Sequence, residues 1–125
     1  MATGGRVLVV DDEEHVTEII EEYFTSLGYE VDIAHDGADA LRRAVAVRPD
    51  VVLLDINMPG VTGDEALNRL HAIDPTVPIV MLTANADEDV ARDLLRRGAM
   101  DYVTKPFQLE TLDRVIATAV AVGRR

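Results

Sequence analysis

Short apolar runs alternate along the chain with longer segments in which apolar residues recur every three or four positions, and this alternation repeats five times. The short runs are rich in β-branched residues, which is typical of strands. They predict strands at residues 6–10, 30–34, 50–54, 78–82 and 100–103. The runs VLVV, VVLL and IVML are apolar at every position, which indicates strands covered on both faces by helices.

The second strand differs from these runs. Val31 and Ile33 alternate with polar neighbours, so one face of this strand is expected to be less apolar than the other. We therefore place it at an edge of the sheet.

The first long segment carries both helix periodicity and helix end signals. Asp12, Glu13 and Glu14 lie where the positive end of a helix dipole favours acidic residues, and Gly28 lies where a left-handed C-terminal cap is expected. Its apolar stripe consists of Val16, Ile19, Ile20, Tyr23, Phe24 and Leu27.

Four more helices are predicted by the same signals. The second covers about 38–47 and ends at Arg48-Pro49, while the third opens with Thr62-Gly63-Asp64-Glu65, which matches a capping box. The fourth covers about 87–97 and the fifth about 109–122. Their apolar positions are Leu41, Ala44 and Val45; Ala66, Leu67, Leu70 and Ile73; Val90, Leu94 and Leu95; and Leu112, Val115, Ile116, Ala119 and Val120. The apolar run 115–122 has more than one apolar face, which predicts a buried helix end, a dimer contact or a docking groove, with a slight preference for a contact with a partner or second copy.

Five βα units joined by short connections predict an α/β fold with right-handed crossovers and a doubly wound parallel sheet. Periodicity does not give the strand order, but 2-1-3-4-5 is a common order and places the polar second strand at an edge. The 125 residues fit a single domain, with short tails expected at 1–5 and 123–125.

Composition narrows the function classes. A net charge of -11 disfavours direct binding to nucleic acid or to anionic membranes, because both carry negative charge. The absence of cysteine excludes disulfides, thiolate metal sites and cysteine nucleophiles. No signal peptide and no apolar stretch of roughly 18 residues is visible, so we expect a cytoplasmic location.

Polar residues stand where the predicted strands end. Asp11 and Asp12 follow the first strand, Asp55 the third, Thr83 the fourth and Lys105 the fifth. Ligands of doubly wound folds bind beyond the carboxyl ends of the strands, so these side chains are expected to meet in one crevice.

Taken singly, each of these residues has an ordinary structural explanation. Asp12 could cap a helix, Asp55 could open a turn, and Thr83 and Lys105 could be surface residues. Together, however, three carboxylates repel one another unless a cation joins them, and Mg²⁺ prefers such oxygen ligands. With a lysine and a hydroxyl nearby, the set suits a phosphoryl group, and a carboxylate is the natural nucleophile.

The segments VLVVDDEE, LLDINMPGVTG, MLTAN and GAMDYVTKPF occur in the order and spacing found in response-regulator receiver domains. The chain resembles this family, and chemotaxis receivers in particular, from about residue 7 to about residue 122. The resemblance implies a flavodoxin-like fold and adds support to the strand order 2-1-3-4-5.

The resemblance also implies roles for individual residues. Asp55 would be the phospho-acceptor, paired with Lys105, and Mg²⁺ would be bound by Asp12, Asp55 and the backbone carbonyl of Asn57, with Asp11 acting through a bound water. Mn²⁺ is an expected substitute ion. Access to the site and the lifetime of the phosphorylated state would be controlled by Ala84, Asn57 and Asn85. The switch residues would be Thr83 and Tyr102.

By the same resemblance, the phosphodonor would be a phosphohistidine on a histidine kinase or phosphotransfer protein, within a two-component phosphorelay. Phosphorylation would switch the face formed by the fourth helix, the fifth strand and the fifth helix, which would bind an effector or a second copy. The chain would not be an enzyme in the usual sense, although it would assist its own phosphorylation and slow dephosphorylation.

Three alternatives are weighed against this interpretation. A haloacid-dehalogenase-type phosphatase would need an acidic residue two positions after the nucleophile, where this chain has Asn57. A flavodoxin-like binding module would need a Ser-, Thr- and Gly-rich loop after the first strand, where Asp11 to Glu14 are all acidic. A degenerate receiver that acts without phosphorylation is disfavoured because all five family positions match.

Overall fold

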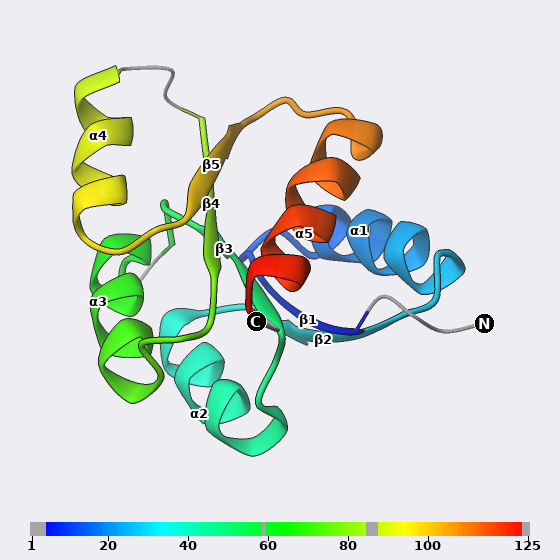
Figure 1. Cartoon of the computed structure of the whole chain (residues 1–125), viewed down its shortest axis with the longest axis horizontal. Coiled ribbons are helices and arrows are strands. Elements are labelled where there is room, and N and C mark those ends of the chain that lie inside the picture. Colours follow the sequence, from blue (N-terminus) through cyan, green and yellow to red (C-terminus); the bar gives the residue numbers. More distant parts are fainter. Residues whose placement is uncertain (1–4, 59, 85–87, 124–125) are drawn as a thin grey trace.

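The protein folds into three layers, a parallel β-sheet with helices on both of its faces (Figure 1). The computed structural model describes residues 5–58, 60–84 and 88–123. The strand order is β2-β1-β3-β4-β5, which confirms the predicted doubly wound topology. Every strand pair is parallel.

The elements follow the predicted alternation of strand and helix. The strands are β1 (Gly5–Val10), β2 (Tyr29–Ala34), β3 (Val51–Asp55), β4 (Ile79–Thr83) and β5 (Asp101–Thr104). The helices are α1 (Glu14–Ser26), α2 (Gly37–Val47), α3 (Gly63–Ile73), α4 (Glu88–Arg96) and α5 (Leu109–Gly123). The last three strands begin and end one residue later than predicted, and Gly5 and Gly123, expected in tails, belong to β1 and α5.

The central strands bury both faces, and alternate residues enter two separate cores. On one face, Leu8, Val52 and Met81 pack with residues of α2, α3 and α4. On the other, Val9 and Leu53 pack with residues of α1 and α5. This arrangement explains why the strand sequences are apolar throughout and not alternating.

Strand β2 lies at the sheet edge, as its alternating pattern predicts. At the amino ends of the strands, Arg6 pairs with Asp32 at 3.0 Å and with Glu30 at 3.3 Å. The backbone N–H of Arg6 also donates to Asp50 at 2.7 Å. Polar contacts at this end of the sheet therefore join β1 to β2 and to the start of β3.

Residues with positive φ follow three of the helices, and after α4 this residue is Gly98, with φ 112°. Gly28 follows α1 with φ 94°, which confirms the predicted glycine cap. After α2 the left-handed residue is Arg48, with φ 48°, and its N–H donates to the carbonyl of Ala44. The helix therefore ends at Arg48 itself, one residue before the proline.

At the N-terminal ends of α1 and α3, the capping contacts differ from those considered from the sequence. The N-cap of α1 is Glu13 and not Asp12, and the Glu13 N–H is instead bound by the carboxylate of Asp11 at 2.9 Å. At α3, Thr62 is the N-cap, but its hydroxyl donates to the Asp64 side chain and makes no cap bond to the backbone. The capping box predicted at Thr62 is therefore wrong, because the nearer carboxylate of Asp64 takes the hydroxyl.

Several residues predicted to lie on apolar helix faces are exposed. Four of them lie in α1, α2, α3 and α4, and the fifth, Leu27, is the C-cap residue of α1. These residues are Ile19, Leu27, Val45, Ile73 and Leu95, all between 40% and 59% exposed. Periodicity gives the direction of a helix face but not its width, which depends on the neighbouring helix.

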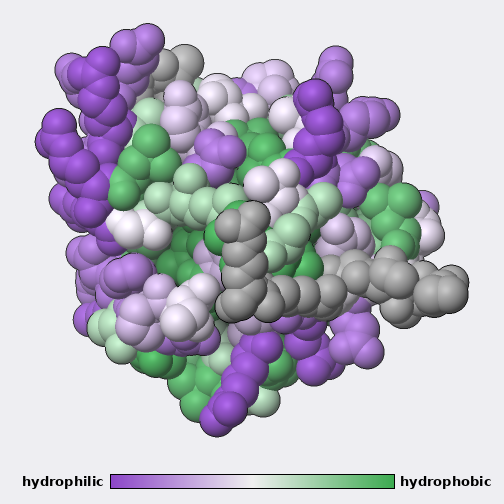
Figure 2. Space-filling view, viewed as in Figure 1, coloured by the Kyte–Doolittle hydropathy of each residue, from purple (hydrophilic) through white to green (hydrophobic). Residues whose placement is uncertain are grey.

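Burial accounts for part of the apolar run 115–122, and the preference for a contact with a partner or second copy stays a prediction. Ile116, Ala119 and Val120 are buried against the sheet, whereas Val122 is 44% exposed. The outer side of α4, by contrast, is strongly hydrophilic (Figure 2), since Glu88, Asp89, Arg92 and other charged residues face outward there. No helix within the described residues is both long enough and apolar enough to cross a membrane.

Candidate functional site

The carboxyl ends of the strands bring the predicted site residues to one edge of the sheet. Asp11 directly follows β1, Asp55 is the last residue of β3, Thr83 is the last residue of β4 and Lys105 follows β5. Because all the strands run parallel in one sheet, their carboxyl ends share an edge. The predicted convergence of the first and third strands with the last is confirmed by contacts between these side chains.

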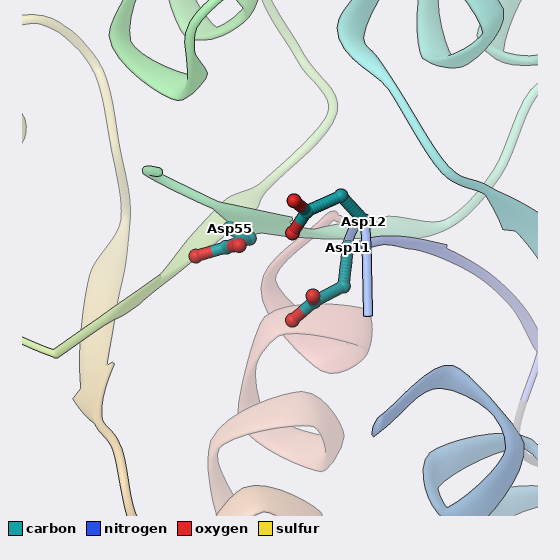
Figure 3. Close-up of side chains that lie close together, drawn as sticks. All are labelled: Asp11, Asp12 and Asp55. Carbon is teal, nitrogen blue, oxygen red and sulfur yellow. The ribbon is translucent and has the colours of Figure 1, made fainter. Parts of the chain in front are cut away.

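The acidic residues form a compact cluster. Figure 3 shows Asp11 and Asp12 at the end of β1 and Asp55 at the end of β3, with their carboxylates turned to the same side. One carboxylate oxygen from each residue lies within 4.8 Å of the other two. Asp11 is fully buried, Asp55 is 3% exposed, and Asp12 faces solvent.

Lys105 is the cation of this cluster. Its ammonium Nζ donates to Oδ2 of Asp11 at 2.8 Å and lies 3.6 Å from Oδ1 of Asp55. The expected pairing of Lys105 with Asp55 is present as an ion pair at 3.6 Å, while the hydrogen bond of the ammonium is made to Asp11. Lys105 is held in place by its own N–H, which donates to the carbonyl of Thr83 at 2.7 Å.

A further carboxylate, which the sequence analysis did not assign to the site, also contacts the lysine. Oε1 of Glu13 lies 3.5 Å from the Lys105 ammonium. In the sequence Glu13 cannot be distinguished from Glu14, since both belong to the acidic start of a helix. Only the direction in which the helix leaves β1 brings Glu13 toward Lys105.

The charges of the cluster are unbalanced. Asp11, Asp12, Asp55 and Glu13 bring four carboxylates to the single ammonium of Lys105. Burial raises the pKa of Asp55 to about 6, and the negative charge of Asp11 adds to this effect, while Lys105 partly opposes it. Burial would lower the pKa of Lys105, but its hydrogen bond and attraction to Asp11 raise that pKa overall.

This excess of negative charge fits a divalent cation. Oxygen donors are what Mg²⁺ prefers, and a cation beside Asp55 would remove the cost of ionising that buried carboxyl group. The donor set of Asp11, Asp12 and Asp55 therefore suits a hard ion of this kind.

The loop after Asp55 is fixed at both ends. The N–H of Ile56 donates to the carbonyl of Leu82 at 2.9 Å, which extends the ladder between β3 and β4 by one bond. The N–H of Asn57 donates to Oδ1 of Asp55 at 3.3 Å. The N–H of Gly63 donates back to the carbonyl of Ile56 at 3.0 Å, which closes the loop.

The remaining predicted residues lie around this cluster or outside the described part. Thr83 is buried at the end of β4, Ala84 follows it and is exposed, and Asn57 is exposed. Tyr102 is half-buried in β5 and packs against the core under α4. Asn85 lies outside the described residues.

Comparison with known protein families agrees with this geometry. The family model for the response regulator receiver domain matches residues 7–117. The chain belongs to the response regulator receiver family. The receiver domain covers nearly the whole chain, and the site described above lies within the matched residues.

Relatives of this receiver domain are response regulators. It is 43% identical to the transcriptional regulatory protein PrrA of Mycobacterium tuberculosis over 123 residues, which are 98% of this chain and 52% of PrrA. It is 38% identical to the regulatory protein AtoC of Escherichia coli over 120 residues, which are 96% of this chain and 26% of AtoC. The chain therefore spans about half or less of the length of these relatives.

Solved structures show the same fold. The receiver domain is similar to chemotaxis protein CheY4 of Vibrio cholerae, with a TM-score of 0.87 and 33% identity, covering 91% of this chain and 97% of CheY4. It is equally similar to the receiver domain of NtrX from Brucella abortus, with a TM-score of 0.87 and 31% identity, covering 92% of this chain and 98% of that domain. The flavodoxin-like architecture predicted from the sequence is thereby confirmed.

Proposed function

We propose that this receiver domain accepts a phosphoryl group on Asp55 with the help of Mg²⁺, and that phosphorylation switches a protein-binding face. The observation that supports this most directly is the position of Asp55. Its carboxylate is almost fully buried, yet it lies in an acidic cluster 3.6 Å from the Lys105 ammonium. A buried carboxylate that is repelled by neighbouring carboxylates does not stabilise the fold, so a chemical role explains the presence of Asp55 at this position better than a structural one.

The reaction is an in-line displacement at phosphorus. An Oδ atom of Asp55 attacks the phosphorus of a phosphohistidine, the new P–O bond forms as the P–N bond breaks, and the released imidazole nitrogen takes up a proton. Lys105 holds a positive charge near the transferred oxygens, which stabilises the charge that they carry. Hydrolysis of the resulting acyl phosphate in the same site returns the protein to its starting state.

Mg²⁺ is the proposed cofactor, and Mn²⁺ is an alternative ion. Asp12, Asp55 and the backbone carbonyl of Asn57 would hold it directly, and Asp11 would act through a bound water, since the Asp11 carboxylate is already engaged by Lys105 and the Glu13 N–H. When bound, the ion supplies Lewis-acid charge neutralisation and orients the phosphoryl oxygens.

Residues at the mouth of the site are proposed to control access and lifetime. Ala84 is small and exposed beside Thr83, which leaves room for a phosphodonor. Asn57 is exposed two residues after the acceptor, where its side chain can affect the approach of water. Asn85 is proposed to act in the same way.

The switch is proposed to run through Thr83 and Tyr102. A phosphoryl group adds about -1.5 to -2 charge and strong acceptor oxygens, and the Thr83 hydroxyl can move to donate to one of them. This movement vacates space behind β4, which Tyr102 can fill from β5. The face formed by α4, β5 and α5 then changes shape.

Partners and context follow from this role. We propose a histidine kinase or phosphotransfer protein as the donor, and an effector protein or a second copy as the partner of the α4–β5–α5 face, in a cytoplasmic two-component phosphorelay. A net charge of -11 disfavours direct nucleic-acid binding by this domain. The 125 residues are proposed to be one receiver domain, and they are not proposed to turn over a substrate as an enzyme does.

The acceptor is tested by treating the protein with acetyl phosphate and Mg²⁺ and measuring intact mass and mobility on Phos-tag gels. One added phosphoryl group is expected, which is lost in Asp55→Asn. An adduct that persists in Asp55→Asn would overturn the assignment. Steady turnover of phosphate monoesters by the wild-type protein would instead support a phosphatase.

The metal site is tested by isothermal titration with Mg²⁺. Asp12→Ala is expected to weaken binding at least tenfold. Glu21→Gln removes one exposed negative charge from the outer side of α1, and it is a control for the loss of charge. Equal effects of the two substitutions would contradict the proposed ligand set.

A further inference from the structure

A glycine outside the site lies in close contact with the loop that carries Asn57. Gly37 is the buried first residue of α2, and Val61 is a half-buried residue of the loop between β3 and α3. A Cβ atom built on Gly37 would lie 2.7 Å from both Cβ and Cγ1 of Val61 and 2.8 Å from its carbonyl oxygen. Real Cβ atoms essentially never approach other heavy atoms this closely.

The backbone conformation of Gly37 does not explain the glycine. The described glycines with positive φ are Gly5, Gly28, Gly60 and Gly98, and Gly37 is not among them. In the middle of a helix, glycine is less favourable than alanine by roughly 0.5–1 kcal/mol, and at a first helical residue without positive φ glycine has no conformational advantage. The close approach of Val61 is what requires the missing side chain.

The loop has few ways to move if Val61 is displaced. Its ends are held by the bonds from Ile56 to Leu82 and from Gly63 to Ile56. Met58 is 6% exposed and packs in the same apolar cluster as Val61. A displacement of Val61 is therefore expected to disturb the packing of Met58, which directly follows Asn57.

We propose that Gly37 is a positioning residue for the metal site: by allowing Val61 to lie against α2, it fixes the loop that carries the Asn57 carbonyl. This inference rests on the proposed function, in which that carbonyl is a ligand. Gly37 acts only through Val61 and contacts neither the ion nor the phosphoryl group.

The test is Gly37→Ala, examined without and with Mg²⁺. In the metal-free protein, the amide resonances of Asn57 and Met58 are expected to shift in a ¹⁵N-correlated NMR spectrum. The Kd for Mg²⁺ is expected to rise at least fivefold. Val61→Ile crowds the same contact from the loop side and is expected to have the same effects, so it replaces Gly37→Ala if that variant does not fold.

Two controls separate positioning from a general loss of stability. Ala44→Gly weakens the same helix seven residues after Gly37, and it is expected to leave the Kd within twofold of wild type. In a Val61→Gly background, the two clashing side-chain atoms are gone and only the contact with the carbonyl oxygen at 2.8 Å remains, so Gly37→Ala is expected to raise the Kd by a smaller factor than it does in the wild-type background.

Unshifted resonances of Asn57 and Met58 in Gly37→Ala, or a wild-type Kd, would overturn the inference. So would an equal loss of affinity in Ala44→Gly. A wild-type protein that does not bind Mg²⁺ would overturn the proposed metal site and the metal part of this inference, and the NMR shifts alone would then decide whether Gly37 positions the loop.

Discussion

Asp55 illustrates how a single side chain depends on its surroundings. Its carboxylate is buried beside Asp11, and these two effects raise its pKa from 3.8 to about 6. The folded state therefore holds the proton of Asp55 more tightly than the unfolded chain does. In the metal-free protein, the free energy of unfolding therefore falls as the pH rises from about 4 to about 6, because Asp55 ionises more easily in the unfolded chain. Above about pH 6 the whole of this loss in the free energy of unfolding remains.

Asp55→Asn should remove this cost. In EDTA at pH 7 to 8, we expect the variant to be more stable than wild type by up to about 3 kcal/mol, because a pKa difference of one unit corresponds to about 1.4 kcal/mol. The gain should shrink as the pH falls from about 6 to about 4, and it should approach zero only below about pH 3, where wild-type Asp55 is protonated in both the folded and the unfolded state. Thermal melts across this pH range measure it, and a difference that does not change with pH would contradict the assignment of the cost to Asp55.

Lys105 should behave differently from the acidic residues. Its hydrogen bond to Asp11 helps to raise its pKa, so it stays protonated at neutral pH. Lys105→Met should slow phosphorylation by acetyl phosphate at least tenfold, since the charge beside the transferred oxygens is lost. The same variant should bind Mg²⁺ at least as tightly as wild type, because a competing cation is removed.

The two measurements on Lys105→Met separate its roles. Phosphorylation is followed by intact mass, and Mg²⁺ binding by isothermal titration. A loss of Mg²⁺ affinity as large as that expected of Asp12→Ala would show that Lys105 organises the metal site and does not only stabilise the phosphoryl group.

Helix α5 has an apolar sequence on more than one face, but only one of these faces is buried in the structure. Ile116 is fully buried against β3 and β4 residues, while Val122 is 44% exposed near the end of the same helix. The apolar run therefore consists of a core-facing side and a solvent-facing margin.

Truncating these two residues should give unequal effects. Ile116→Ala should lower the free energy of unfolding by about 2–5 kcal/mol, because it removes buried methyl groups and leaves a cavity. Val122→Ala should change it by less than about 0.5 kcal/mol. Urea unfolding measures both, and a large loss for Val122→Ala would indicate that its side chain is covered, for example in a dimer.

Over the whole molecule, the proposed switch links the site at the strand ends to the face formed by α4, β5 and α5. Thr83 at the end of β4 pairs in register with Thr104, and Met81 pairs with Tyr102. A change at Thr83 therefore has a short path through two adjacent strands to Tyr102.

Thr83→Ala should separate phosphorylation from switching. The variant should still accept a phosphoryl group on Asp55, because the nucleophile and Lys105 are unchanged. The ring resonances of Tyr102 should, however, change far less on phosphorylation than they do in wild type, since the hydroxyl that responds to the phosphoryl group is absent. Equal changes of Tyr102 in both proteins would contradict a route through Thr83.

The sequence by itself determined the layered α/β fold, the edge position of β2 and the residues that end each strand. Local periodicity, β-branched runs and glycine caps are properties of neighbouring residues, so they can be read without coordinates. The order of the strands needed a family resemblance, because periodicity carries no information about which strands are adjacent.

Only the tertiary structure decided the contacts within the site and the widths of the helix faces. It paired Lys105 most closely with Asp11, brought Glu13 to the same ammonium, and placed Gly37 against Val61. It also left Ile73 and Val45 exposed. These outcomes depend on distances between elements that lie far apart in the chain, and such distances follow from how the helices pack on the sheet and not from the pattern of any one segment.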